Sequence, residues 1–393
     1  MKLLIKWFQL LPKKVYVFFN FVLFALKEYR KILNSDVIFF FPFYQTGGAE
    51  TVHVNIVNTF KEQKTYIFFE KLSNSENNKS SFIKYSNFFE VYYFLNTTNI
   101  SQKLFIKYLI VVINKSKAKS VFASNSNLFY KILPNLKNKI KKIDLTHAFT
   151  HSNYGGEIVT LPYVKYLTNR VVINRNTLLD FKELYLKHNL QKYYSRILII
   201  QNGIKIGNTD FIEKDKKVIN IGFVGRWAKE KRPELFLDIA SKITSFATNY
   251  NFYFIGNNKT EKSKDITRSN IIDLGEIFKK DKLFSYYRKF HFIFITSKRE
   301  GFPVVLMEAM KFGVVPICTN VGGISEHIFN NKNGYLIDNC DNEKVIIEKF
   351  IEKLISIKMD SDYLKLSGNA KIYANNNFNL KEFKNNYRKL LLE

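Results

Sequence analysis

The chain has 393 residues, of which 46% are hydrophobic and 24% charged. This composition is ordinary for a folded chain and excludes disorder over most of the length. The length exceeds the roughly 250–300 residues at which a single hydrophobic core stops growing, so we expect two domains.

Lysine and arginine outnumber aspartate and glutamate by 61 to 34, which gives a formal net charge of +27. A field of this sign attracts polyanions: nucleic acid, an anionic membrane surface or phosphorylated substrates. Lysine is spread along the whole chain, and the sequence has no zinc-finger spacing, basic zipper or RNP-type aromatic signature. An anionic membrane surface or a phosphorylated substrate is therefore the favoured partner, and no nucleic-acid partner is expected. Two distant cysteines, Cys318 and Cys340, indicate no disulfide framework and fit a reducing cytoplasm.

Residues 1–35 form a basic and aromatic segment. Its longest apolar stretch, residues 15–26, is shorter than the roughly 20 residues that a helix needs to cross a bilayer. One interpretation is an interfacial anchor on the inner face of the cell membrane, and the other is a buried first helix of the domain. In the first interpretation the aromatic side chains enter the lipid and the lysines contact headgroups. These residues are Trp7, Phe8, Phe18, Phe19 and Phe21, with Lys2, Lys6, Lys13 and Lys14.

Apolar runs alternate with helical segments along the rest of the chain. The candidate strands are residues 37–41, 65–69, 120–123, 170–173 and 196–200, followed by 218–224, 252–255, 292–296 and 314–318. Continuous apolar runs of this kind are typical of parallel strands buried on both faces, so the predicted class is α/β and doubly wound.

A polar, turn-rich stretch at residues 205–217 separates the two series of strands. The predicted organisation is an N-terminal domain at 36–204, a linker at 205–217, a second domain at 218–375 and a closing C-terminal helix at 376–393. Doubly wound sheets bind ligands beyond the carboxyl ends of their strands. We therefore expect the functional loops at those ends, facing a cleft between the domains.

Two segments carry features that suit phosphate. Gly47 and Gly48 follow the first strand and open a helix, where free amides attract anions and glycine allows close approach. Arg226 follows the strand that ends at Gly225, and Lys231 comes five residues later, so both cations can converge on a diphosphate. The alternatives are a glycine turn without a ligand and a solvated basic helix start.

The segment from Glu300 to Glu326 holds two further features. Glu300 lies at a strand end, and Glu308 lies in an apolar helix, where a carboxylate is costly to bury without a hydrogen-bonding partner such as a ribose diol. Amides at the start of that helix can hold phosphate. The residues concerned are Gly301, Phe302, Pro303 and Val304. Gly322 and Gly323 then form a second strand–turn–helix unit, which either binds phosphate or only shapes the turn.

Together these segments resemble glycosyltransferase family 4, the retaining group of the GT-B fold. The resemblance rests on the two glutamates eight apart, the strand-end Gly-Arg with its Lys, the N-terminal Gly-Gly loop and the Gly-Gly-x-x-Glu tail, and it is strongest over residues 218–337. It implies two Rossmann-like domains with an interdomain cleft and a nucleotide-sugar donor, UDP- or GDP-linked.

The resemblance also implies residue roles. Arg226 and Lys231 would neutralise the leaving diphosphate, Glu308 would bind the ribose hydroxyls, and Glu300 would contact the donor sugar near the reacting carbon. Gly47 and Gly48 would close over the phosphates. The family often has a histidine near the donor sugar, a place for His147 or His151. No metal is expected, because the two cations do its electrostatic work.

The implied activity is hexosyl transfer with retention to a glycan acceptor. The charge and the aromatic N-terminus favour a lipid-linked precursor of a bacterial surface polysaccharide, such as O antigen, capsule or lipopolysaccharide. One alternative is a soluble transferase of the same fold that acts on a protein or a small molecule. Another is a basic nucleic-acid binder without enzymatic activity, which Arg226, Lys231, Glu300 and Glu308 disfavour.

Overall fold

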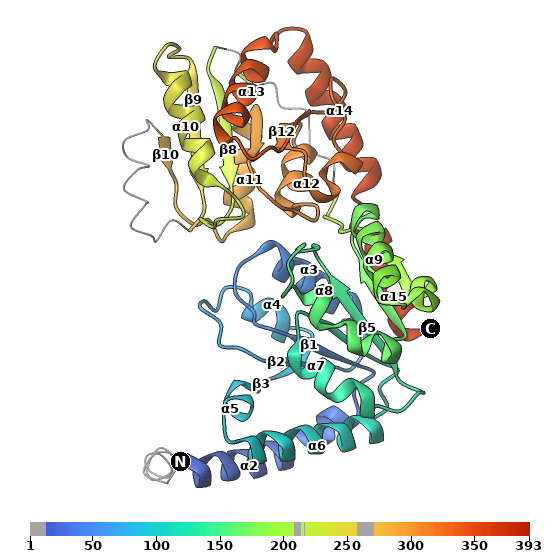
Figure 1. Cartoon of the computed structure of the whole chain (residues 1–393). Helices are drawn as coiled ribbons and strands as arrows, with labels where there is room; N and C mark the ends of the chain where they lie inside the picture. Colours follow the sequence, from blue (N-terminus) through green and yellow to red (C-terminus); the bar gives the residue numbers. More distant parts are fainter. Residues whose placement is uncertain (1–12, 208–213, 216, 258–270) are drawn as a thin grey trace, which may run out of the picture. The chain divides into compact units, whose positions relative to one another are not determined.

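The computed structural model describes residues 13–207, 214–215, 217–257 and 271–393 (Figure 1). The chain forms two compact units. Unit 1 comprises residues 1–172, 181–200 and 384–393, and unit 2 comprises residues 173–180 and 201–383. Neither unit is a single stretch of chain.

Unit 1 contains a parallel seven-stranded sheet in the order β3-β2-β1-β4-β5-β6-β7. The strands are β1 (Val37–Phe41), β2 (Thr65–Phe69), β3 (Asn87–Glu90), β4 (Ser120–Ser124), β5 (Lys141–Thr146), β6 (Asn169–Val172) and β7 (Ile197–Ile199). Every residue of β1, β2 and β4 is buried. This agrees with the prediction from the apolar runs that the strands are covered on both faces. The strand order reverses between β1 and β4, so the loops after these strands lie at the topological switch point.

Helices cover this sheet. They are α2 (Lys13–Leu33), α3 (Gly48–Val57), α4 (Lys79–Ile83), α5 (Tyr92–Leu95), α6 (Asn99–Lys115), α7 (Asn127–Ile132), α8 (Gly156–Val159) and α9 (Arg175–Lys187), with short 3₁₀ helices at Asn58–Phe60, Leu133–Asn135, Leu161–Tyr166 and Gln191–Arg196. The first residues of α9 belong to unit 2 and the rest to unit 1.

Unit 2 contains a parallel six-stranded sheet in the order β10-β9-β8-β11-β12-β13. The strands are β8 (Ile219–Val224), β9 (Tyr250–Ile255), β10 (Ile271–Asp273), β11 (Phe292–Ile295), β12 (Val315–Thr319) and β13 (Tyr335–Ile337). The helices are α10 (Pro233–Thr244), α11 (Lys280–Lys289), α12 (Val304–Lys311), α13 (Glu343–Ser356) and α14 (Asp362–Asn377), with a short turn of helix at Gly322–Glu326. Helix α15 (Leu380–Leu392) begins in unit 2 and continues in unit 1. Here the order reverses between β8 and β11. The predicted α/β class with two doubly wound sheets is confirmed.

Over its described side chains, helix α2 has one buried side and one side exposed to solvent. Phe24 and Ile32 are buried, and the carboxylate of Glu28 accepts a hydrogen bond from the Tyr66 hydroxyl at 3.0 Å. The opposite side exposes Leu23 and Leu26, with exposed fractions of 56% and 76%. The interpretation as a buried first helix therefore holds for one face only. Trp7, Phe8, Lys2 and Lys6, which we expected at a lipid surface, lie outside the described residues.

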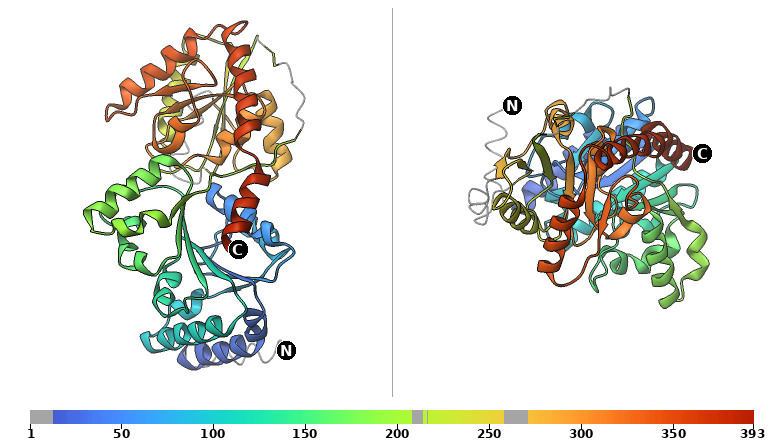
Figure 2. Two further views of the ribbon diagram at one scale, coloured as in Figure 1. Left: turned by 90° about the vertical axis from the view of Figure 1, so that its right-hand side faces the viewer. Right: turned by 90° about the horizontal axis from the view of Figure 1, so that it is seen from above.

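Helix α2 packs along α6, and the two helices lie side by side in Figures 1 and 2. Phe21 and Phe24 meet Phe105 and Tyr108 of α6 at ring-centroid distances of 5.3–6.2 Å. Among the helices of the described ranges, none is long and apolar enough to cross a membrane.

The predicted closing segment at 376–393 contains the end of α14 and all of α15. Phe383, Tyr387 and Leu391 are buried, which matches the helical spacing of the apolar residues there. The Tyr387 ring lies 5.8 Å from that of Phe122 in β4, and Arg388 donates a hydrogen bond to the Thr59 carbonyl at 3.0 Å. Most of α15, from residue 384 onward, is therefore a part of unit 1.

Candidate functional site

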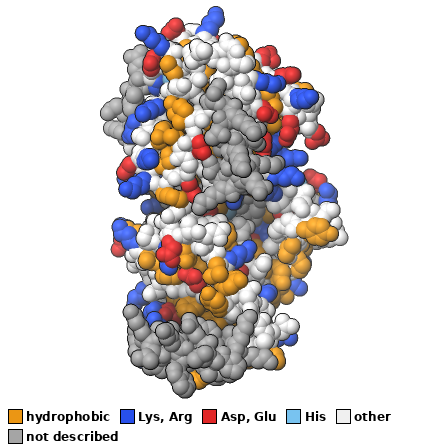
Figure 3. Space-filling model, turned by 90° about the vertical axis from the view of Figure 1, so that its left-hand side faces the viewer, with side chains coloured by type: hydrophobic (Ala, Val, Ile, Leu, Met, Phe, Trp, Pro, Cys, Tyr) orange, Lys and Arg blue, Asp and Glu red, His pale blue; other side chains and the backbone are white. Residues whose placement is uncertain are grey.

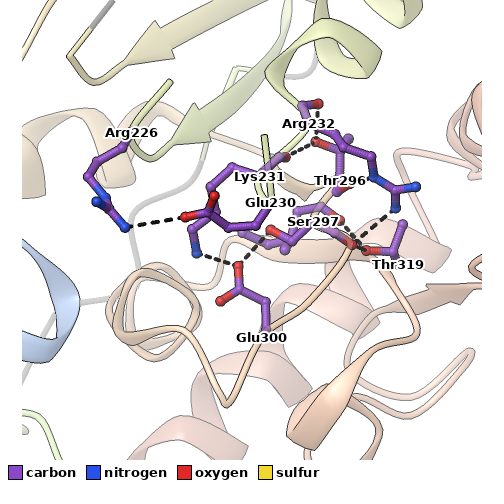
Figure 4. Close-up of polar contacts among 9 residues, drawn as sticks. Arg226, Glu230, Lys231, Arg232, Thr296, Ser297, Glu300 and Thr319 are labelled. Atoms are coloured by element: carbon purple, nitrogen blue, oxygen red, sulfur yellow. Dashed lines mark hydrogen bonds and ion pairs between the residues drawn. The ribbon is translucent and has the colours of Figure 1, made fainter. Parts of the chain in front are cut away.

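The loop between β8 and α10 carries the two cations that we predicted as phosphate ligands. Lys231 donates through Nζ to Oε1 of Glu300, 2.5 Å away, in the loop after β11 (Figure 4). Arg226 is exposed and lies 3.4 Å from Glu230. Because β8 and β11 flank the point where the strand order reverses, these loops lie where doubly wound sheets bind ligands.

Arg232 ties the two loops together and was not among the predicted site residues. Its backbone is left-handed, with φ of 46°, and its side chain is 7% exposed. The guanidinium donates to the carbonyls of Thr296 and Ser297 and to the Asn339 side chain at 2.6–3.1 Å. The Thr296 hydroxyl lies 2.9 Å from the carbonyls of Lys231 and Arg232 and donates to them (Figure 4). These bonds fix the neighbouring Lys231, and burial lowers the pKa of Arg232.

The Glu300 carboxylate is held from two sides. The Ser297 hydroxyl donates to it at 2.6 Å, in addition to the Lys231 ammonium. Its side chain is only 9% exposed. A buried carboxylate stays ionised only if nearby groups stabilise its charge. When no ligand is bound, Lys231 and Glu300 neutralise each other's charge.

The second Gly-Gly turn packs directly on the Glu300 loop. Gly322 has φ of +54°, and a Cβ there would lie 1.7 Å from the Glu300 carbonyl oxygen. The Gly323 N–H donates to the Gly301 carbonyl at 2.7 Å. Close packing thus accounts for both glycines, and they support the Glu300 loop whether or not they also approach a ligand.

Glu308 lies inside α12 and is 5% exposed, as its place in an apolar helix predicted. Its carboxylate has a partner that the sequence did not indicate, the Lys280 ammonium at the start of α11. Lys280 is half-exposed, so a ligand can reach this pair from solvent. A diol that hydrogen-bonds to Glu308 would share the carboxylate with Lys280.

The residues between the glutamates have different environments. Phe302 is buried against His327 and Phe378, with ring centroids at 4.3 and 5.3 Å. Any contact of residue 302 with a donor must therefore come from its backbone. Pro303 caps α12, which begins at Val304, and as a proline it has no backbone N–H to offer to a phosphate.

Glu326, the last residue of the Gly-Gly-x-x-Glu tail, caps the start of α9. Its two oxygens accept hydrogen bonds from the backbone N–H groups of Arg175 and Asn176 at 2.8 and 2.7 Å. The Asn176 side chain donates to the Gly322 carbonyl at 2.6 Å. A carboxylate at a helix N-terminus satisfies amides that otherwise lack partners. The tail therefore has a structural role in unit 2.

In unit 1, Gly47 and Gly48 lie at the switch-point end of β1 and start α3. Gly47 has an extended backbone that any residue can adopt, with φ of 175°. Its carbonyl accepts hydrogen bonds from the N–H and the hydroxyl of Thr51. His147 follows the end of β5 and is partly buried, whereas His151 is exposed.

Two further observations concern ligands. A hollow of about 740 Å³ borders the loop after β8, and its lining includes Trp227, Lys229, Arg232 and Lys298 but not Lys231, Glu300 or Glu308. Within the described part of the chain, no group of three or more histidine, cysteine, aspartate or glutamate side chains is placed to hold a metal ion. The metal-independence that we expected stays a prediction.

Residues 208–371 match the family model described as glycosyl transferases group 1. The chain carries a group 1 glycosyltransferase domain. Of the features that suggested the family, Arg226, Lys231, the two glutamates and the Gly-Gly-x-x-Glu tail fall within the matched part, whereas the N-terminal Gly-Gly loop lies outside it. The family prediction is confirmed.

Known proteins resemble this chain over different lengths. It is 32% identical over 171 residues to the capsular polysaccharide biosynthesis glycosyltransferase CapM of Staphylococcus aureus, which is 39% of this chain and 44% of CapM. It is 26% identical over 267 residues to an uncharacterized 41.2 kDa protein in the cps region of Klebsiella pneumoniae, 57% of this chain and 73% of that protein. The chain thus spans less than half of CapM.

A solved structure matches nearly the whole chain. The Anabaena protein HepE in complex with UDP superimposes with a TM-score of 0.71 at 13% identity, over 91% of this chain and 99% of HepE. This likeness shows the fold. Two parallel α/β sheets of seven and six strands are the GT-B architecture, as predicted.

Proposed function

We propose that this glycosyltransferase transfers a hexose from a UDP- or GDP-sugar to a glycan acceptor, with retention and without a metal. The observation that carries the proposal is the pairing of Lys231 with Glu300 at the switch point of the second sheet, with Glu308 in the helix that follows. The family match over these residues and the UDP bound by HepE support it.

In this proposal, Lys231 and Arg226 bind the diphosphate of the donor. A diphosphate would compete with Glu300 for the Lys231 ammonium and free the carboxylate to contact the sugar. Backbone amides of residues 301 and 304 can add donors beside the phosphate. Arg226 offers a planar fork for phosphate oxygens, while Lys231 acts as a compact charge, so the leaving group is neutralised by fixed cations.

The donor can be identified by thermal shift against UDP-, GDP- and ADP-sugars in the presence of EDTA. The cognate nucleotide should raise the melting temperature by mass action, and the Lys231→Ala variant should lose most of that shift. Turnover by Lys231→Ala should fall roughly 100-fold, the scale for removing one preorganised charge. Lys229→Ala is the matched control on the same loop. Undiminished transfer by Lys231→Ala or Glu308→Ala would contradict the assignment.

Gly47, Gly48 and His147 complete the proposed donor-binding set in unit 1. Their roles rest on the family resemblance. Gly48→Val should raise the donor KM, because a branched side chain blocks the approach to the amides that open α3. His147→Ala should lower kcat, with His188→Ala at an exposed position as the control.

The acceptor, in this proposal, is a lipid-linked precursor of a surface polysaccharide, reached from an anionic membrane surface. The exposed residues of α2 and α6 support the membrane contact. Leu23 and Leu26 on α2 and Ile100, Leu104 and Val111 on α6 are each at least half-exposed. Exposed Lys27, Arg30, Lys103 and Lys107 stand among them. An apolar strip with cations at its sides is typical of helices that lie in the membrane interface.

Vesicle binding tests the membrane contact. The full chain should sediment with vesicles of phosphatidylglycerol and phosphatidylcholine and less with phosphatidylcholine alone. The triple variant Leu23→Gln, Leu26→Gln and Leu104→Gln should lose this binding yet keep donor hydrolysis. Phe246→Gln and Ile372→Gln, exposed apolar positions of unit 2, are the control. Deleting residues 1–31 is a poor test, because Phe24 and Glu28 lie in the core.

Equal vesicle binding by the triple variant would favour the soluble transferase that acts on a protein or a small molecule. The nucleic-acid alternative has little support on the surface seen in Figure 3, where Lys and Arg side chains are scattered among acidic ones and not gathered in a stripe. The nucleic-acid alternative would be supported if the protein bound a nucleic-acid duplex in a salt-sensitive manner and had no affinity for UDP or GDP.

A further inference from the structure

Two histidines of unit 1 form a direct pair. Nε2 of His53, in α3, lies 2.9 Å from Nε2 of His147, at the end of β5. His53 is fully buried and stacks on Phe41 of β1, with ring centroids 4.3 Å apart and planes at 13°. His147 is partly buried. His53 is thus fixed by packing from β1 and α3, and it contacts a residue that we place beside the donor sugar.

One proton must lie between the two Nε2 atoms. Burial lowers the pKa of His147 to about 4, and burial followed by repulsion from His147 lowers the pKa of His53 far below its ordinary value. Both rings are therefore neutral at pH 7. In a neutral imidazole one nitrogen carries a hydrogen and the other a lone pair, so one ring donates and the other accepts.

The environment of His53 decides which ring donates. Its Nδ1 is buried and has no hydrogen-bond partner in the described part of the chain. A buried N–H without an acceptor is rarer and costlier than a lone pair without a donor. His53 therefore keeps its proton on Nε2 and donates to His147. His147 then carries its own proton on Nδ1.

Nδ1 of His147 is the nitrogen that remains for a ligand. It makes no hydrogen bond with any described residue and is not one of the buried polar atoms without a partner, so solvent reaches it. We propose that His53 is a positioning residue, which holds His147 as the Nδ1–H tautomer and makes it a hydrogen-bond donor to an oxygen of the donor sugar. This rests on the role proposed above for His147.

The assignment limits the chemistry available to His147. An Nδ1–H group can donate to a hydroxyl or ring oxygen but cannot take a proton there, so His147 is not the base for the acceptor hydroxyl. The proton of that hydroxyl must go elsewhere, which is consistent with transfer to the departing phosphate oxygen. Helix α3 also begins at Gly48, so one rigid element carries both the glycine loop and the residue that sets the tautomer of His147.

The tautomer can be read directly. In the full chain labelled with ¹⁵N-histidine, long-range ¹H–¹⁵N correlation at pH 7.5 should show the Nδ1–H form for His147 and the Nε2–H form for His53. His53→Phe keeps the stacking on Phe41 but removes the donor, so His147 should move toward the Nε2–H form. An Nε2–H signal for His147 in the unmodified chain, or an unchanged signal in His53→Phe, would overturn the proposal.

Kinetics give the second readout. His53→Phe should lower kcat roughly tenfold with little change in donor KM, the scale of one hydrogen bond made in the transition state. His53→Gln, which restores an N–H donor, should recover part of the loss, and His188→Phe should change neither value. Equal loss in His53→Gln and His53→Phe would contradict positioning. If His147→Ala transfers sugar normally, the role of His147 fails, while the tautomer measurement still tests the pair.

Discussion

The side chains of the candidate site in unit 2 are held in place by residues on other helices and loops. Lys231 and Glu300 were both predicted, but the Ser297 and Thr296 hydroxyls that hold their loops have no signature in the sequence. The same applies to Lys280, which stands 28 positions before its partner Glu308. The pairing of Lys280 with Glu308 can be recognised only when the packing of α11 against α12 is known.

The Lys280–Glu308 pair leads to a prediction about nucleotide affinity. Lys280 contacts one oxygen of the carboxylate and so fixes its orientation for a diol. We expect Lys280→Met to weaken UDP or GDP binding by roughly three- to tenfold, since one charge-assisted hydrogen bond orients the acceptor group. Calorimetric titration measures this, with Lys282→Met, an exposed neighbour, as control. Tighter binding in Lys280→Met would show that the lysine competes with the ribose.

A buried ion pair joins β5 and β6 in unit 1. Arg170 contacts Asp144 through Nε and Nη2, and both residues are 1% exposed. Asp144→Ala should cost about 3–5 kcal/mol, because it leaves the guanidinium buried without a countercharge. The double variant Asp144→Leu, Arg170→Met should lose much less, as nonpolar pairs often replace such bridges at little cost. Urea unfolding measures both, and equal losses would refute the ion-pair explanation.

At the scale of elements, the strands that could be predicted from the sequence are those formed by continuous runs of buried, mainly apolar residues. β1, β2 and β4 fit that rule, whereas β5 did not, since its run Lys141–Thr146 contains Lys142 and Asp144. Asp144 is buried there only because Arg170 of β6 neutralises it, and a pairing between strands leaves no periodic signal. The missed strands β3, β10 and β13 lie at sheet edges and are three or four residues long.

The site was predictable to a similar extent. Glu300 and Lys231 stand out because strand ends and charged residues are local features. The capping role of Glu326 and the pairing of His53 are not, since each depends on an element more than ninety positions away. Phe302 shows the converse: a motif residue was expected at the donor, but its ring packs on Phe378.

The turn before Glu326 gives a prediction at this scale. Gly322→Ala adds a Cβ at a left-handed position, against the Glu300 carbonyl. It should destabilise unit 2 by more than about 1 kcal/mol and lower donor turnover, since the Glu300 loop must move. Gly275→Ala is the matched control, because Gly275 has φ of +61° with open space around it. If both variants lose the same stability and keep turnover, the contact with the Glu300 loop has no effect.

At the scale of the whole molecule, buried histidines predict sensitivity to acid. Burial lowers the pKa values of His147, His291 and His327 to about 4, with Lys214 adding to the effect at His291. Burial, followed by repulsion from His147, also lowers the pKa of His53. Each ring is neutral when folded and binds a proton when unfolded below pH about 6.5. The unfolded state therefore binds more protons, and stability rises with pH across this window.

We expect the free energy of unfolding to be highest above pH 6.5 and to fall as the pH drops from 6.5 to 4, by at most about 1.4 kcal/mol per pH unit for each histidine. Guanidinium unfolding at pH 7.5 and 5 measures this. His327→Phe should reduce the dependence on pH, whereas His188→Phe, at an exposed site, should leave it unchanged. A flat profile between pH 7.5 and 4.5 would contradict the burial of these rings.

The return of α15 to unit 1 has a consequence for synthesis. The β1–β7 sheet has left the ribosome soon after residue 200, but residues 384–393, which cover Phe122 and bind the Thr59 carbonyl, are synthesised much later. At typical translation rates of roughly 5–20 residues per second, the sheet waits about 10–40 s with that surface uncovered. Chaperone dependence during this interval, and aggregation of chains that stop before residue 384, follow because α15 completes unit 1 long after the sheet of that unit has been made.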